Sequence, residues 1–251
     1  MRQIRKGILF FFALMVIGML MSGCTSGEDR SEEKKQSAQF AAIIYEDVLR
    51  DLTEQQPEGY PVILTEILKT VPDTSFTKVY VDIWEMNYSF DGVKFKEETG
   101  SHIPYRYDIN DAGEIIKKWT PRDGSEYADS ILEMTEHKKY LADQMLANSE
   151  ETPDDRKVLT ELKRVALERG LKEEEFSFAL DQIPGLEKDV VHIREDIPDG
   201  FVCVISKKEY DALQKERTDS QETGGQWVCR ECLLWDEKTG ICVEYLLDYM
   251  Q

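Results

Sequence analysis

The sequence has few of the residue types that mark common catalytic or nucleic-acid-binding sites. It has only three histidines, and no His-Glu-x-x-His or Gly-x-Ser-x-Gly motif occurs. A zinc protease and an α/β-hydrolase therefore have no support in the sequence. Basic residues are also scarce: 31 lysines and arginines face 50 aspartates and glutamates, for a formal net charge of −19. Such a surface repels phosphate backbones, which argues against nucleic acid as a partner.

Long apolar runs are absent except at the N-terminus. Arg2, Arg5 and Lys6 precede a 15-residue apolar run at positions 7–21. This run is shorter than the roughly 20 residues that a membrane-spanning helix needs. A basic start, a short apolar run and small residues are typical of a secretory signal peptide, so we expect residues 1–23 to be removed. The alternative is a single-pass anchor that the mature chain retains.

The four residues that end this segment, Met21-Ser22-Gly23-Cys24, resemble the lipobox of bacterial lipoproteins. The resemblance implies that the Cys24 thiol receives diacylglycerol, that the chain is cut before Cys24, and that the new N-terminus is acylated, for example with palmitate. A cysteine thiol suits this attachment because it is nucleophilic, and more than one acyl chain gives stable anchoring. The expected location is the extracytoplasmic face of the cell membrane, where the lipid anchor is the membrane contact.

The stretch that follows the lipidated cysteine is polar. Residues 25–39 contain one apolar residue, Ala38, and no aromatic residue, so we expect 24–39 to form a flexible tether. Loss of residues 1–23 removes three positive charges and lowers the net charge from −19 to −22. Such an acidic surface favours solubility. It could also attract cationic partners, but a solvated acidic surface is the preferred interpretation.

Residues 40–147 are predicted to form an α+β domain that contains an antiparallel meander. Apolar spacing predicts a helix over 40–53, and Pro61, which suits the first turn of a helix, predicts a second short helix over 62–70. Runs of β-branched and aromatic residues, separated by turn residues such as Asp91-Gly92, predict four strands. These strands are expected at 78–88, 93–97, 103–109 and 114–119. A helix that covers the meander is predicted over 125–146, with Ser125 as its N-cap.

A polar stretch at 148–154 predicts the start of a second α+β domain, 148–251. Helical patterns in this domain cover 153–169, 172–182 and 207–216, and a loop is expected over 218–225. Its expected strands are 190–193, 201–206, 226–235 and 241–249. The last two form a hairpin, and Gly240 as the bulge residue would pair Trp235 with Cys242.

Four cysteines lie in this second half, at Cys203, Cys229, Cys232 and Cys242. An even number in an exported chain suits disulfides, whereas a tetrahedral set with Cys229-x-x-Cys232 suits zinc. Buried free thiols are the third interpretation. In an extended strand, Cys229 and Cys232 would point to opposite faces, with Cα atoms about 10 Å apart, too far for a mutual disulfide. The sequence leaves the three interpretations open, and zinc is the one cofactor that it suggests.

Two short motifs resemble those of penicillin-binding proteins and serine β-lactamases: Ser75-x-x-Lys78 and Lys238-Thr239-Gly240. The resemblance implies a cell-wall-directed serine acyltransferase or hydrolase, with Ser75 as nucleophile and Lys78 serving its deprotonation. That chemistry needs Lys78 one helical turn from Ser75. Here the motif enters a predicted strand, where residues i and i+3 lie on opposite faces. A catalytic role is therefore the alternative hypothesis.

Three further patterns have simpler interpretations. Asp108-x-Asn110 begins like a calcium loop, but Trp119 stands where the bidentate glutamate belongs, so a hairpin turn is expected. A Cys203–His192 nucleophile pair is conceivable, although strand or turn positions explain both residues. The meander aromatics either line a ligand groove or form sheet core: Tyr80, Trp84, Tyr88, Tyr105, Tyr107 and Trp119.

The preferred hypothesis is a membrane-anchored, non-catalytic binding or assembly module. Its meander face would meet a small ligand or another protein of the envelope. A structural zinc-binding module in the C-terminal half is a further alternative.

Overall fold

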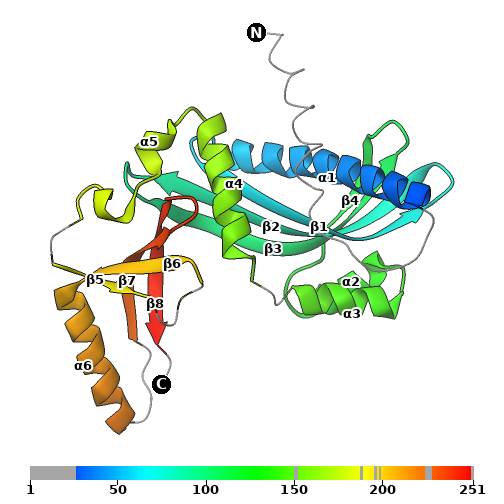
Figure 1. Cartoon of the computed structure of the whole chain (residues 1–251). Helices are drawn as coiled ribbons and strands as arrows, with labels where there is room; N and C mark the ends of the chain where they lie inside the picture. Colours follow the sequence, from blue (N-terminus) through cyan, green and yellow to red (C-terminus); the bar gives the residue numbers. More distant parts are fainter. Residues whose placement is uncertain are drawn as a thin grey trace. The chain divides into compact units, whose positions relative to one another are not determined.

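The computed structural model describes residues 27–149, 152–186, 189–194, 197, 199–223 and 228–249 (Figure 1). Within these ranges, the side chains of 27–33, 217–223, 228–230 and 247–249 are not described. The predicted signal peptide and Cys24 lie outside the described residues. Among the described residues, no helix is both long and apolar enough to span a membrane.

The chain folds into two compact units, which we describe separately. Unit 1 comprises Met1–Glu54, Ile63–Glu85 and Ser101–Thr152, and unit 2 comprises Gln55–Val62, Met86–Gly100 and Pro153–Gln251. The sequence predicted two contiguous domains, 40–147 and 148–251. Both units are instead discontinuous in sequence, because the hairpin of β2 (Phe76–Phe90) and β3 (Phe95–Asn110) contributes to each of them.

Unit 1 consists of a long helix, four consecutive strands and a short helical pair. Besides the hairpin strands, it contains α1 (Gly27–Gln55), β1 (Tyr60–Pro72), β4 (Ile115–Trp119), η4 (Gly124–Glu126), α2 (Tyr127–Met134) and α3 (Lys139–Asn148). The strands neighbour one another in chain order, and β4 pairs antiparallel with β3. The predicted α+β class is confirmed.

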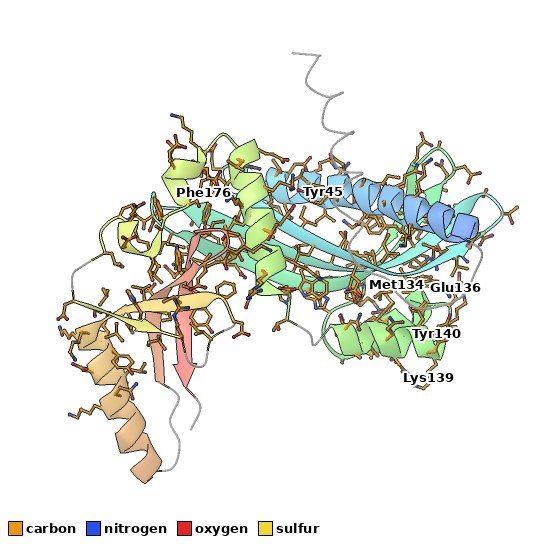
Figure 2. The ribbon with its side chains drawn as sticks, in the orientation of Figure 1. Tyr45, Met134, Glu136, Lys139, Tyr140 and Phe176 are labelled. Atoms are coloured by element: carbon orange, nitrogen blue, oxygen red, sulfur yellow. The ribbon has the colours of Figure 1, made fainter. Side chains whose placement is uncertain are left out.

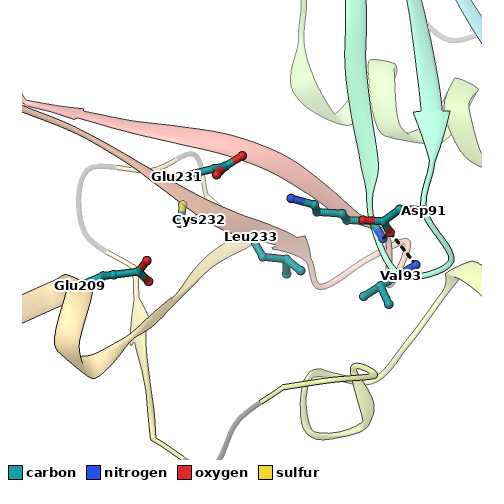
Figure 3. Close-up of a pocket in the computed structure, with 7 residues that line it drawn as sticks. Asp91, Val93, Glu209, Glu231, Cys232 and Leu233 are labelled. Atoms are coloured by element: carbon teal, nitrogen blue, oxygen red, sulfur yellow. Dashed lines mark hydrogen bonds between the residues drawn. The ribbon is translucent and has the colours of Figure 1, made fainter.

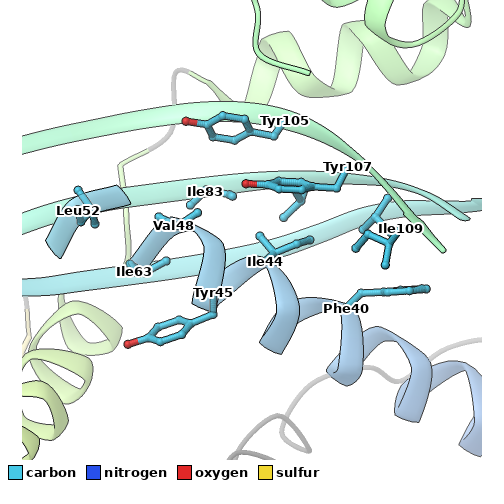
Figure 4. Packing of buried hydrophobic residues seen from close by; sticks show 12 residues of the cluster. Phe40, Ile44, Tyr45, Val48, Leu52, Ile63, Ile83, Tyr105, Tyr107 and Ile109 are labelled. Carbon is cyan, nitrogen blue, oxygen red and sulfur yellow. The ribbon is translucent and has the colours of Figure 1, made fainter. Parts of the chain in front are cut away.

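Side-chain alternation gives the sheet of unit 1 two buried faces. Odd-numbered residues of β2 and β3, including Val81, Ile83 and Tyr107, pack against the apolar stripe of α1 (Figures 1 and 4). That stripe comprises Phe40, Ile44, Tyr45, Val48 and Leu52. On the other face, Tyr80 packs with residues of α2 and α3: Ile131, Met134, Leu141, Ala142 and Met145. Because successive strand residues point to opposite faces, one strand contributes to both cores.

Unit 2 contains the C-terminal strands and four helices. These elements are α4 (Asp155–Glu168), α5 (Glu173–Phe176), η5 (Leu180–Gln182), β5 (Val190–Ile193), β6 (Phe201–Ser206), α6 (Lys207–Thr223), β7 (Val228–Asp236) and β8 (Cys242–Tyr249). Strands β5, β6, β7 and β8 are antiparallel neighbours, and β8 joins β3 through one parallel pair, Phe95 with Val243. The predicted register of the last hairpin is confirmed, because Trp235 lies opposite Cys242.

Two predicted segments near the start of the fold are wrong. Residues 62–70 were predicted as a helix but belong to strand β1, where β-branched residues pack beside β2. The tether predicted over 24–39 is helical from Gly27, because α1 extends N-terminally from its amphipathic part. Glutamate, lysine, glutamine and alanine in this stretch are good helix formers, so the helix continues beyond its buried face.

Five other features differ from the prediction. Strands expected at 93–97 and 103–109 form one strand, β3, whose Glu97 and Glu98 accept hydrogen bonds from Tyr88 and Ser89 of β2. The covering helix predicted over 125–146 is divided into α2 and α3, since Glu136 and His137 have φ values of 55° and 61°. Ser125 lies within η4 and does not cap the helix. The helix predicted over 172–182 is replaced by two short helices, α5 and η5. The loop predicted over 218–225 is helical up to Thr223, where α6 ends.

Ile83 tests the importance of the core beneath α1. This side chain is fully buried, so Ile83→Ala should lower the free energy of unfolding by about 3 kcal/mol, through lost burial and a residual cavity. The matched control is Ile116→Ala on β4, whose side chain is 56% exposed and should change stability by less than about 0.5 kcal/mol. Urea unfolding of both variants provides the comparison. Equal losses in the two variants would contradict this packing.

Candidate functional site

Unit 2 contains an open groove of about 320 Å³ (Figure 3). Its lining residues come from the β2–β3 turn, from the first turn of α6 and from the middle of β7. They are Asp91, Val93, Lys94, Glu209, Glu231, Cys232 and Leu233. The volume lies at the lower end of the range for small-molecule sites. The groove is therefore large enough for a small group or an extended side chain.

Local sequence fixes the turn that forms one end of the groove. Gly92 has a φ of 99°, a conformation that glycine adopts without steric cost. The Asp91 carboxylate accepts hydrogen bonds from the backbone N–H groups of Val93 and Lys94, both at 2.9 Å. The Asp91-Gly92 hairpin predicted from the sequence is thus confirmed. The turn holds Asp91 and Lys94 at the edge of the groove.

The charges around the groove are predominantly negative. Three carboxylates line it, at Asp91, Glu209 and Glu231, against the single ammonium group of Lys94. That ammonium group lies 2.6 Å from the Glu244 carboxylate, which also pairs with Lys96 at 3.2 Å, and the hydrogen bond from Lys94 lowers the pKa of Glu244. Glu244 therefore stays ionised and is shared by the two lysines. Among the residues that line the groove, carboxylates outnumber ammonium groups by three to one, which favours a cationic ligand.

A pair of cysteines lies beside the groove. Cys203 of β6 is opposite Leu234 of β7, so Cys203 and Cys232 are diagonal neighbours on one face. Their Sγ atoms are 2.7 Å apart, within hydrogen-bonding distance. The contact with Cys232 lowers the pKa of Cys203. Cys203 is fully buried, whereas Cys232 is 7% exposed.

Cys242 lies on the opposite face of this sheet. It pairs with Trp235, and both pack in a cluster with Val202 and Val204. Burial raises the pKa of the Cys242 thiol to about 12. Since Cys242 and the Cys203–Cys232 pair face opposite ways, these three sulfurs do not converge on one tetrahedral site. The described residues include no group of three or more ligands that could hold a metal ion.

Cys229 is described only by its backbone. Strand β7 continues without a turn through Arg230 and Glu231, as expected for an extended strand and not for a zinc knuckle. Positions 229 and 232 therefore face opposite sides of the sheet. This backbone path differs from the zinc knuckle that one of the three open interpretations required.

The Ser75-x-x-Lys78 motif lies at the turn from β1 to β2 and in β2 itself. Ser75 is exposed, and the Lys78 ammonium group lies 2.5 Å from Glu136 and 3.1 Å from Asp73. The hydrogen bond to Glu136 raises the pKa of Lys78, so the amine stays protonated near neutral pH. A protonated amine cannot accept the proton of a serine hydroxyl.

The second half of that resemblance, Lys238-Thr239-Gly240, forms the β7–β8 turn in unit 2. Thr239 donates its hydroxyl to the Asp236 carboxylate at 2.6 Å, and Gly240 has a φ of 72°. Ser75 belongs to unit 1. Both motifs thus consist of turn and strand residues whose contacts are accounted for by the local fold.

Glu136 also contacts the buried ion pair of Arg106 and Asp108 in unit 1. Arg106 binds Asp108 through two hydrogen bonds of 2.7 and 3.0 Å, and it donates to the Met134 carbonyl and to Glu136. Glu136 lies in the loop between α2 and α3, near the exposed Lys139 and Tyr140 (Figure 2). These contacts stabilise the positive φ of Glu136 and explain why the helix is interrupted here.

The calcium-like residues form a hairpin turn, as predicted. Asn110 accepts hydrogen bonds from the backbone N–H groups of Ala112 and Glu114 at 3.0 and 2.9 Å. Asp108 is engaged by Arg106, and the Trp119 indole N–H lies 3.4 Å from its carboxylate. These residues therefore stabilise the β3–β4 connection.

The histidines do not form the suggested nucleophile pair. His192 lies opposite Val204 and Cys203 opposite Ile193, so the two side chains point to different faces of the sheet. His102 stacks on Trp84, with ring centroids 4.0 Å apart. His137 is exposed in the α2–α3 loop.

The meander aromatics are core residues. Tyr80, Trp84, Tyr88, Tyr105 and Tyr107 are each less than a tenth exposed, while Trp119 is half-buried. The sheet-core interpretation is confirmed for these five, and the meander face in unit 1 is covered by helices. Sequence reasoning missed Glu209 and Glu231 of the groove, because nothing distinguishes them among 50 acidic residues. The one sequence feature that could have pointed to a groove residue is the position of Glu231 next to Cys232 in the chain.

Comparison with known proteins gives no relative. No family model matches the chain, and neither a curated protein nor a solved structure is significantly similar to it.

Glu136 tests the ion network through the pH dependence of stability. Its hydrogen bond with Lys78 lowers the pKa of Glu136 below the ordinary value of 4.5. The stabilisation is therefore present above that value and is lost as the pH falls through the pKa of the folded state. Glu136→Gln should cost roughly 0.5–1 kcal/mol at pH 7, since the site is partly solvent-screened, and almost nothing near pH 3.

Urea unfolding at the two pH values measures this difference. Glu66→Gln, an exposed substitution on β1, provides the matched control and should show no comparable dependence. A loss for Glu136→Gln that is the same at both pH values would contradict an ionic contribution.

Proposed function

We propose that this chain is a lipid-anchored extracytoplasmic protein of bacteria whose folded part is a non-catalytic binding or assembly module. The basic start, the apolar run at 7–21 and the lipobox-like Met21–Cys24 support the anchor. Lipid on Cys24 would hold the folded units at the outer face of the cell membrane. The membrane contact is therefore assigned to the N-terminus and the binding role to the folded units.

The acidic groove is the observation that carries the binding role. It combines an open cavity with three carboxylates and a lysine that is ion-paired with Glu244. The matching ligand chemistry is a cationic group, such as an amine or a basic side chain of another envelope protein. The net charge of −22 expected for the mature chain favours the same class of partner.

The non-catalytic assignment is supported by the contacts of the candidate catalytic residues. Lys78 is held by two carboxylates, Thr239 by Asp236, and His192 and Cys203 face different sides of their sheet. Each of these groups has a structural role that accounts for its position. Catalysis would require them to leave those contacts.

The lipid anchor is tested by substitution of Cys24. Cells that express the full chain and are supplied with radiolabelled palmitate should label the wild type, and Cys24→Ala should lose all of the label because no thiol remains for attachment. Cys242→Ala is the control and should keep the label. Label that persists in Cys24→Ala would contradict the proposed anchor.

The alternative catalytic hypothesis is tested with a fluorescent penicillin. We expect no covalent labelling of the full chain, because the ion-paired Lys78 amine stays protonated. A known penicillin-binding protein in the same gel confirms that the reagent works. Labelling of the wild type that disappears in Ser75→Ala would establish the serine acyltransferase and overturn the non-catalytic assignment.

A further inference from the structure

Two cysteines of unit 2 are placed as a bonding pair. Cys203 and Cys232 come from adjacent antiparallel strands, occupy diagonal positions and share one face. Their Sγ atoms, 2.7 Å apart, are closer than van der Waals contact between two sulfur atoms permits. Formation of a disulfide needs a further approach of these two atoms and a two-electron oxidant. Cys242 is on the other face of the sheet, so it does not compete for a disulfide with Cys203 or Cys232.

The two sulfurs differ in their access to solvent. Cys203 is fully buried, whereas Cys232 lines the acidic groove next to Glu231 and near Glu209 (Figure 3). An external reagent therefore reaches Cys232 first. Cys203 is then positioned to attack from inside the sheet, where no external reagent competes with it.

We propose that Cys203 and Cys232 form a redox pair, in which a disulfide is made and broken by thiol–disulfide exchange that enters through Cys232 from the acidic groove. The oxidant is an organic disulfide. The Cys232 thiolate attacks one of its sulfurs and expels a first thiolate, which leaves a mixed disulfide on Cys232. The Cys203 thiolate then attacks Cys232 and expels a second thiolate. One disulfide is thus reduced to two thiols, and two cysteines are oxidised to one disulfide.

The groove selects the charge of the reagent. Asp91, Glu209 and Glu231 disfavour an anionic disulfide near Cys232 and favour a cationic one. This step uses the same charge argument as the proposed binding role, but the disulfide itself depends only on the positions of the two sulfurs. The two parts can therefore be tested separately.

The bond would close a loop of the chain that contains α6. Cys203 and Cys232 are 29 positions apart, and α6 lies between them in the sequence. Oxidation would tie the start of β6 to the middle of β7 and fix the ends of this loop. Since Cys232 lines the groove, the redox state of the pair changes the chemical nature of one lining residue of the candidate binding site.

Peptide mapping of the wild type tests the pair. The full chain is equilibrated with glutathione disulfide, its free thiols are alkylated in denaturant, and it is digested without reduction. The expected result is one linked peptide pair that joins Cys203 to Cys232, with Cys242 alkylated. Cys242→Ala should keep this link. A link that involves Cys229 or Cys242, or no link at all, would overturn the proposed pair.

Trapping of the mixed disulfide tests the order of attack. In Cys203→Ala, Cys232 should retain a stable adduct with the oxidant, whereas in Cys232→Ala the buried Cys203 should gain none while the protein is folded. Melting curves show whether each variant is folded. A folded Cys232→Ala variant that forms an adduct on Cys203 would overturn the assigned entry point.

Reaction rates of the Cys203→Ala variant test the charge of the groove. Relative to free cysteine, Cys232 should prefer dicationic cystamine over dianionic dithiodipropionate. Glu209→Gln should reduce that preference by roughly two- to fivefold at low salt. Glu174→Gln, an exposed substitution on α5, is the control. An unchanged preference would refute the claim that the groove selects reagents by charge. The peptide mapping would still test the cysteine pair separately.

Discussion

The strict alternation of side chains along β2 and β3 is the constraint on which the rest of unit 1 depends. Val79, Val81 and Ile83 point towards α1, while Tyr80 points towards α2 and α3. Each strand therefore supplies two cores, and a shift of register by one residue would exchange them. The same alternation places Arg106 and Asp108 on the α2–α3 face, where their ion pair is shielded from solvent. Apolar and ionic contacts consequently fix the same register.

Alternation has a chemical consequence in unit 2. The β7–β8 register places Cys242 opposite Trp235 in an apolar cluster, and the β6–β7 register brings Cys203 diagonal to Cys232 on the other face. The cysteines are thus divided between a core role and a position beside an acidic groove. Most of the meander aromatics are used for packing, whereas this groove combines accessibility with several charged side chains.

Local signals in the sequence predicted some of these features well. The Asp91-Gly92 turn, the two central strands and the pairing of Trp235 with Cys242 all follow from residues close together in the chain. Strand β1 was mistaken for a helix because Pro61 suits the first turn of a helix, and only pairing with β2 shows otherwise. The break between α2 and α3 depends on Lys78 and Arg106, which are distant in sequence from Glu136.

The candidate site was harder to predict than the fold for the same reason. Glu209, Glu231 and Asp91 come from three separate segments, and each resembles many other acidic residues. Even the cysteines, which the sequence did single out, could not be paired without the register of β6 against β7. Sequence pattern identifies what a strand or turn is, whereas a site depends on which strands become neighbours.

The central claim is that both faces of the meander in unit 1 are used by the fold, so that binding is left to the groove. Hydrogen exchange of the full chain, followed by mass spectrometry, tests it most directly. Amides of β2 and β3 near Val81, Ile83 and Tyr107 should be the slowest in unit 1 and should exchange only with global unfolding. Exchange as fast as that of the exposed α2–α3 loop at Glu136 and His137 would show that the helices open readily. The meander face would then again be the candidate binding surface.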